Sequence, residues 1–245
     1  MMLKSFAVVL FAIVLSVKST SLPLPSYLTP CKRDDPKLDD CALQNGKLGL
    51  PYILKGDKKY GIPNFYPLKI NEITMETAGN LKIKLKDVEV HGLENAELQR
   101  VKIDTKAKKF YVDFKVNTIN ILGKYDMDGR ILILPIKGNG DANITAIGGD
   151  FHYNFEYKLE NRDGEEYMKS TKQNIDYEVG RLFIQFDNLF NGDKVLGANA
   201  NEVLNKEWES VFKEMKEPIG NTILTVASSI LDNILSKVPH KYTIL

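Results

Sequence analysis

One stripe of apolar residues near the C-terminal end constrains the fold of this 245-residue chain most. Between positions 204 and 235 apolar side chains recur every three or four residues, which is the period of an amphipathic helix. The stripe consists of Leu204, Trp208, Val211, Met215, Ile219, Ile223, Val226, Ile230 and Ile234, widened by Phe212, Leu224, Ala227, Leu231 and Leu235. We expect a helix of about 35 residues, about 50 Å long. Pro218 should kink it near residues 216–220, and Pro239 should end it.

Upstream, from about residue 68 to residue 186, the apolar period is two instead of 3.6, which indicates antiparallel strands with one solvated face. Hairpin turns are expected at residues 127–130, 138–141 and 161–165, where glycine follows or precedes asparagine or aspartate. The apolar phase slips between Val116 and Ile119, which predicts a β-bulge. Because only this sheet can cover the apolar stripe along its whole length, we expect it to curve around the helix as a long trough.

The N-terminal segment reads as a secretory signal peptide, residues 1–20, followed by a single domain, residues 21–245. Lys4 precedes an uncharged, mostly apolar run from Phe6 to Val17, which is too short to span a bilayer. A buried N-terminal helix is the alternative. Loss of this segment moves the formal charge from +1 to −1, which gives no electrostatic reason to bind nucleic acid or an anionic membrane. No other apolar run is long enough for stable insertion into a membrane.

Two cysteines, Cys31 and Cys41, lie close together near the expected mature N-terminus. In a secreted protein such a pair predicts a disulfide, and free thiols are the alternative. Asp35 and Pro36 suit the start of a short helix, about 36–45, that the disulfide would tie to the preceding chain. Asn143 begins an Asn-Ile-Thr sequon and is a candidate glycosylation site.

The stretch from Phe186 to Asn205 resembles a calcium loop at first sight but fails the template. Its third position is Leu189 where an oxygen donor is needed, and its twelfth is Ala198 where a bidentate glutamate is needed. The same stretch suits a tight turn leading into the long helix, with Asn199 as the cap and Glu202 as its capping-box partner. We therefore expect this stretch to connect the last strand to the long helix. We expect no metal site in it.

Several segments together resemble the takeout family of secreted insect proteins, relatives of the juvenile-hormone-binding proteins. They are the early Cys31 and Cys41 and the segments GIPNFYPLKI, VHGLENAELQRVKID, GKYDMDGRILILPIKGNGDANI and FDNLFNGDKVLGANANEVLNKEWE. The resemblance implies an α+β fold of the tubular lipid-binding (TULIP-like) kind, a super-roll in which a strongly curved antiparallel sheet wraps a long C-terminal helix. It also implies a hydrophobic tunnel for a lipophilic small molecule. The hormone-binding relatives usually carry a second disulfide, so two cysteines favour the takeout branch.

A carrier of a lipophilic molecule, such as a terpenoid, fatty acid or quinone, is the function that these observations predict. Apolar side chains with a few polar groups line such tunnels. The candidate lining residues are Phe114, Val116, Tyr125, Leu132, Leu134, Trp208, Phe212 and Met215, and ordinary core packing is the alternative for each. The alternative function is a lipid-transfer or protein-interaction module without a dedicated small-molecule ligand.

We expect no catalysis and no cofactor, since the sequence has no nucleophile-elbow pattern and His91, His152 and His240 have no metal-site spacing. These histidines suit surface or strand positions better than the role of a general base. The glycines of residues 138–143 lack the third glycine of a dinucleotide loop. We also expect a monomer that does not bind nucleic acid.

Overall fold

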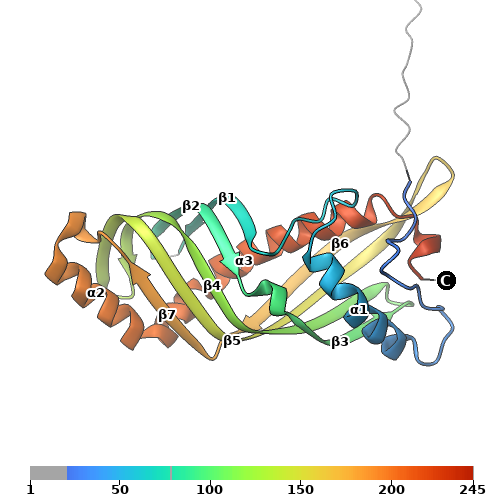
Figure 1. The fold of residues 1–245 in the computed structure, drawn as a ribbon, viewed down its shortest axis with the longest axis horizontal. Helices are drawn as coiled ribbons and strands as arrows, with labels where there is room; N and C mark the ends of the chain where they lie inside the picture. Colours follow the sequence, from blue (N-terminus) through green and yellow to red (C-terminus); the bar gives the residue numbers. More distant parts are fainter. Residues whose placement is uncertain (1–20, 78, 245) are drawn as a thin grey trace, which may run out of the picture.

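The structure is a computed structural model that describes residues 21–77 and 79–244. It is elongated, with one long helix running obliquely along a curved sheet (Figure 1). In chain order the elements are α1 (Leu38–Leu54), β1 (Leu68–Glu76), β2 (Lys82–His91), η1 (Leu93–Asn95), β3 (Glu97–Asp104), β4 (Lys109–Ile131), β5 (Leu134–Arg162), β6 (Glu165–Glu178), β7 (Arg181–Phe186), η2 (Phe190–Gly192), α2 (Lys194–Lys206), α3 (Trp208–Leu235) and η3 (His240–Tyr242).

The described strands form one antiparallel sheet in the order β1-β2-β4-β5-β6, with β3 also pairing with β4 and β7 with β5. β4 and β5, of 23 and 29 residues, make a hairpin that runs along most of the molecule. Strands this long carry a large cumulative twist, so the sheet coils into a trough. This confirms the expected curved antiparallel sheet.

The expected bulge between Val116 and Ile119 is not present, because the register of β4 against β5 does not shift there. The phase slip in the sequence coincides instead with a change in the strand that neighbours β4. On the edge opposite β5, β4 pairs with β3 up to Lys115 and with β2 from Asn120 onward. Residues 116–119 of β4 therefore lie between the end of the pairing with β3 and the start of the pairing with β2. Register shifts occur elsewhere, between Lys86 and Glu89 of β2 for example.

Two of the three expected hairpin turns are wrong. The turn at Asp163 and Gly164 is confirmed, and both residues have positive φ, as a two-residue hairpin requires. Residues 127–130 and 138–141 instead lie inside β4 and β5, and the chain reverses at Leu132 and Ile133. A Cβ on Gly140 would lie 2.4 Å from the carbonyl oxygen of Asp187, so this glycine permits a close approach of backbone instead of a turn.

The C-terminal apolar stripe is divided between two helices, which corrects the expectation of a single rod. The break lies at Glu207, whose φ and ψ are −97° and 27°, and the two helices meet at a corner (Figure 1). α3 continues through Pro218 to Leu235. The expected cap at Asn199 is also wrong, because Asp193 is the N-cap of α2. Its Oδ1 accepts hydrogen bonds from the amides of Val195 and Leu196, both at 3.0 Å.

The first helix is longer than expected and runs through Gly46 to Leu54. Gly46 does not end it. A Cβ there would lie 2.7 Å from Cδ2 of Leu98 on β3, and one on Gly49 would lie 2.4 Å from Cδ2 of Leu28. Both glycines therefore allow neighbouring segments to pack closely against α1. From the sequence alone, a glycine that allows close packing cannot be distinguished from a glycine that ends a helix.

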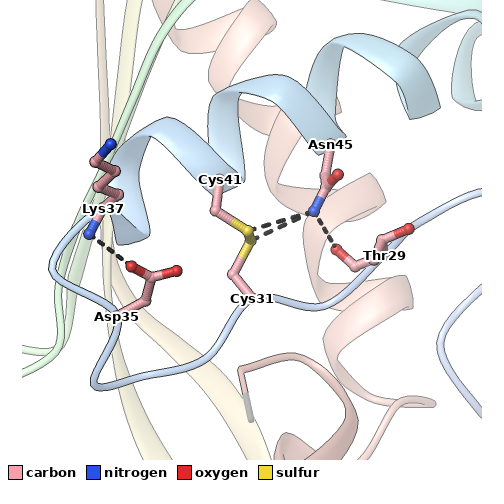
Figure 2. The surroundings of a disulfide bond; sticks show 6 residues. All are labelled: Thr29, Cys31, Asp35, Lys37, Cys41 and Asn45. Atoms are coloured by element: carbon pink, nitrogen blue, oxygen red, sulfur yellow. Dashed lines mark hydrogen bonds between the residues drawn. A yellow bond between two sulfur atoms is a disulfide. The ribbon is translucent and has the colours of Figure 1, made fainter.

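The disulfide between Cys31 and Cys41 is confirmed and joins α1 to the chain that precedes it (Figure 2). Asn45, one turn further along α1, donates its Nδ2 hydrogen to the carbonyl oxygen of Thr29 at 3.1 Å. The same Nδ2 lies 3.5 Å and 3.4 Å from the two sulfur atoms. Side chain and disulfide together fix the N-terminal segment on this helix.

Candidate functional site

The trough is closed by α3, which touches both rims of the sheet. α3 lies closest to β6, β7 and β1, and β1 and β6 are the two ends of the strand order. The sheet therefore curls until its opposite edges meet the same helix. The central strands β4 and β5 form the floor opposite the helix. This arrangement is a tube with α3 as one wall.

The burial of side chains changes along α3. Val211, Phe212 and Met215 are buried near one end of the helix and Leu235 near the other. From residue 216 to residue 234, all of which are described, no residue of α3 is buried. The apolar stripe continues through this stretch, with Ile219, Ile223, Ala227 and Leu231 half-buried.

The strands of the floor show the same half-burial. The β4 side chains Phe110, Val112 and Phe114 and the β5 side chain Tyr153 are each half-buried although they lie in the middle of the sheet. The buried residues accordingly fall into three separate clusters instead of one continuous core. Protein interiors are normally packed to high density, so this break in the core is the feature from which a ligand site can be proposed.

All eight candidate lining residues lie in the largest of these clusters, which is next to the corner between α2 and α3. Val116, Tyr125, Phe212 and Met215 are buried, whereas Phe114, Leu132, Leu134 and Trp208 are half-buried and pack against them. The eight residues thus lie together in one cluster, as ordinary core packing would also require. Contact of these residues with a ligand stays a prediction.

The half-buried residues in the middle of α3 and on β4 were not among the predicted lining residues, although they belong to patterns visible in the sequence. Ile219, Ile223, Ala227 and Leu231 are members of the helical stripe, and Phe110 follows the strand alternation. The periodicity tells which face they occupy. The periodicity does not show how far that face lies from the opposite wall. This distance decides whether a residue packs in the core or could line a cavity.

Aromatic side chains form the floor near the filled end. Phe114 stacks on Phe151 with ring centroids 4.9 Å apart, and Phe151 stacks in turn on Tyr177 at 5.9 Å. Tyr177 meets Phe212 of α3 edge to face at 5.6 Å. The hydroxyl group of Tyr177 donates to the carbonyl oxygen of Lys216 at 2.9 Å, which fastens β6 to α3. Burial raises the pKa of Tyr177, so the hydroxyl remains a donor.

A surface pocket of about 360 Å³ opens along the seam between β6 and α3. Ile175, Tyr177 and Leu224 contribute its apolar lining. At its edge Lys216 forms ion pairs with Asp176 and Glu178, and the hydrogen bonds that the lysine donates to Glu178 and Asp176 raise its pKa. The pocket between β6 and α3 therefore has an apolar lining with charged side chains at its solvent-facing edge.

The histidines lie on three different elements. His91 is at the end of β2 and His152 is exposed on β5, where its Nδ1 is 3.1 Å from Asp113. His240 is buried, with its Nε2 2.6 Å from Nη2 of Arg33, and burial followed by the charge of Arg33 lowers its pKa. Within residues 21–77 and 79–244, no group of three or more histidine, cysteine or acidic residues could hold a metal ion. In the same part of the chain no helix is long and apolar enough to cross a membrane.

Comparisons with known proteins agree with this geometry. Residues 8–245 match the model of a family described as haemolymph juvenile hormone binding protein. The chain is 24% identical over 229 residues to the circadian clock-controlled protein daywake of Drosophila melanogaster, covering 88% of this chain and 86% of the relative. Against daywake of Drosophila yakuba the identity is 23% over 227 residues, with the same coverage.

Among solved structures, Takeout 1 of Epiphyas postvittana is similar with a TM-score of 0.78 at 27% identity. The similarity covers 88% of this chain and 98% of the solved one. The expected α+β tubular lipid-binding fold, with an antiparallel sheet around a long C-terminal helix, is thereby confirmed.

Proposed function

Because this chain belongs to the haemolymph juvenile hormone binding protein family, we propose that it is a secreted carrier of a lipophilic small molecule. The family consists of binding proteins for hydrophobic ligands, and the chain is accordingly not an enzyme. We place the ligand between α3 and the floor formed by β4 and β5. The observation that carries this proposal is the break in the core along residues 216–234 of α3.

The eight residues predicted from the sequence form, in this proposal, the closed end of the tunnel. The half-buried side chains of the middle stretch line the rest, including Phe110, Ile223 and Ala227. A terpenoid, a fatty acid or a quinone has the long apolar body that such a space fits. Met215 at the closed end is unbranched and flexible, which suits ligands of varied shape.

The family name and the N-terminal sequence support export of the chain. We propose that residues 1–20, which lie outside the described residues, are a signal peptide and that residues 21–245 fold as a single monomeric domain. The disulfide fits an oxidising compartment. Asn143 is exposed on β5, where glycosylation can be tested by enzymatic deglycosylation and mass spectrometry.

The direct test is to express the protein by secretion and identify what co-purifies with it. Native mass spectrometry should detect a bound lipophile, and solvent extraction should release it. Added lipophile should also raise the melting temperature of delipidated protein by mass action. Protein that yields no extractable lipophile, binds no fluorescent fatty probe and melts unchanged would exclude the carrier function.

A matched pair of variants locates the ligand. Ala227→Trp fills the middle of the tube and should strongly weaken binding of the probe. Ser229→Trp adds the same ring at an exposed position of α3 and should not. Equal probe affinity in both variants would place the ligand elsewhere. Exchange of phospholipid between vesicles, without binding of single-chain lipophiles, would favour the lipid-transfer alternative.

A further inference from the structure

The outward face of α1 is apolar and basic in its C-terminal half. Leu48 and Tyr52 are 71% and 55% exposed, and Pro51 between them is exposed as well. Lys47 and Lys55 are exposed on either side of them. Positions 48, 51, 52 and 55 have the spacing that places residues on one face of a helix, and position 47 borders that face. These five residues, the α1 patch, therefore form one continuous surface.

The aromatic ring in the α1 patch is held in place by the protein. The ring of Tyr52 stacks on that of Tyr27, with centroids 5.7 Å apart and planes 9° apart. The hydroxyl group of Tyr27 donates to Oδ2 of Asp57 at 3.1 Å. On the same helix Nζ of Lys55 lies 5.9 Å from the centroid of the Tyr52 ring. A ring that is already ordered loses little conformational entropy when it meets a partner.

The charge around the α1 patch differs from that of the whole chain, which is nearly neutral. Asp57, the one acidic residue of positions 41–67, accepts hydrogen bonds from Tyr27 and from the amide of Lys59. Exposed Asp40 belongs to the same helix and lies two turns before Leu48. Positions 41–67 also contain four lysines, which are Lys47, Lys55, Lys58 and Lys59. This part of the surface is therefore locally cationic.

The composition of the α1 patch fits a lipid surface better than a protein partner. Protein interfaces favour arginine and are depleted in lysine, and positions 41–67 contain four lysines and no arginine. A specific protein interface also needs about 20 to 30 residues on each side. Lysine and tyrosine suit the boundary of a bilayer, because their apolar parts enter the headgroup layer while their polar ends stay in water.

We propose that the α1 patch is a peripheral docking surface for a bilayer that contains anionic lipid. Leu48, Pro51 and Tyr52 would enter the headgroup layer, and the lysines would contact the lipid phosphates and carboxylates. This is reversible attachment of a folded protein to a surface, without a spanning segment. It is also independent of any ligand in the tube.

The position of α1 gives this docking a consequence for the proposed carrier function. Ile53 of α1 packs against a cluster of buried residues, and Ile230 and Ile234 of α3 pack against the same cluster. α1 lies in the half of the molecule away from α2 (Figure 1). A docked protein would therefore hold the C-terminal part of α3 near the bilayer. If the chain is a carrier, its ligand would pass between tube and membrane at this end.

The test measures flotation of delipidated protein with vesicles of phosphatidylcholine alone or with one part in three of phosphatidylserine. Wild-type protein should bind the anionic vesicles at least tenfold more tightly, and added salt should weaken this binding. The double variant Lys47→Gln and Lys55→Gln should lower the affinity for anionic vesicles by about tenfold, since each lysine contributes separately. The double variant Leu48→Ser and Tyr52→Ser should lower it by a similar factor, because it removes the apolar contact.

Two matched controls lie on α2, at the other end of the molecule. Leu196→Ser removes a leucine that is 50% exposed, and Lys206→Gln removes an exposed lysine. Both variants should bind anionic vesicles like wild type. All of these positions are exposed, so thermal unfolding of each variant should match that of wild type and show that a loss of binding does not come from unfolding.

A second measurement reports on the docked face directly. Trp208, the one tryptophan of the chain, lies at the corner between α2 and α3, so brominated lipid should quench little of the emission of wild type. Tyr52→Trp places an indole in the α1 patch, and brominated anionic vesicles should quench its emission and shift it to shorter wavelength. Equal quenching in wild type and this variant would mean that another face meets the bilayer.

The outcomes separate this proposal from the carrier function. If wild type binds no vesicles, or if Leu196→Ser weakens binding as much as the α1 variants do, the docking surface is wrong, whether or not the protein binds lipophiles. If the protein dimerises and Leu48→Ser with Tyr52→Ser makes it monomeric without changing vesicle binding, the α1 patch is a contact between two copies. If vesicles bind but no fluorescent lipophile does, docking stands and the carrier function fails.

Discussion

Asn205 of α2 hydrogen-bonds to both backbone groups of Ile184 of β7. Its Oδ1 accepts from the amide of Ile184 at 2.9 Å, and its Nδ2 donates to the carbonyl oxygen of the same residue at 2.6 Å. One turn earlier, Asn201 makes the same pair of bonds with Phe186. The two side chains take the place of a neighbouring strand and satisfy backbone groups of β7 that a helix cannot otherwise reach.

Replacement of Asn205 by alanine should therefore lower the free energy of unfolding by about 2 to 3 kcal/mol, because it leaves a half-buried amide and carbonyl without partners. Urea denaturation measures the loss. Asn199→Ala, an exposed asparagine on the same helix, is the matched control and should stay within about 0.5 kcal/mol of wild type. Equal costs for the two variants would contradict the role of Asn205.

The start of α2 gives a second prediction. Since Asp193 caps this helix, Asp193→Ala should cost about 1 kcal/mol of stability, whereas Asp193→Asn should cost much less because it keeps the accepting oxygen. The same denaturation series measures both. If Asn199→Ala proved as costly as Asp193→Ala, the helix would begin where the sequence alone suggested, and the observed cap would be wrong.

Much of this fold follows from periodicity. The alternation from Phe110 to Val116 predicts the first part of β4, and the stripe from Trp208 to Leu235 predicts α3. The corner at Glu207 was not predictable in the same way, because Leu204 and Trp208 keep helical spacing across it. The apolar periodicity shows which side chains share a helix face. A corner between two helices that keeps the same face toward the core does not change this periodicity, so it cannot be detected from it.

Two of the expected hairpin turns were wrong because they were predicted from glycine residues. A glycine that permits close backbone approach, such as Gly140, has the same sequence neighbourhood as one that permits a turn. The site shows the same limit. Ala227 and Leu231 belong to the apolar stripe of the helix, but their distance from β4 depends on the curvature of the sheet, which no local pattern records.

Removal of the disulfide should destabilise the protein by about 2 to 3 kcal/mol, the loop-entropy value for a closed ring of this length. The variant carries Cys31→Ser and Cys41→Ser together, so that no free thiol remains. Thermal unfolding compares it with wild type under oxidising and reducing conditions. Reduced wild type should melt with the double variant. Should the double variant melt with oxidised wild type, the disulfide would not contribute to stability.

Tyr125 gives a prediction about alkaline pH. Its hydroxyl group donates to the carbonyl oxygen of Asp187 at 2.6 Å, and burial, followed by the charge of Asp187, raises its pKa to about 12. In the unfolded chain the pKa is about 10. The folded state therefore holds the phenol proton more tightly, and the resulting stability is fully present below about pH 10 and declines as the pH rises toward 12.

Tyr125→Phe removes this ionisation together with the hydrogen bond. At neutral pH the variant should be less stable than wild type by about 1 kcal/mol, the typical contribution of one hydrogen bond. Between about pH 10 and pH 12 its stability should fall less steeply, because one fewer phenol drives unfolding. Urea denaturation at a series of pH values measures both slopes. Parallel slopes across this interval would mean that Tyr125 does not bind its proton more tightly in the folded protein than in the unfolded chain.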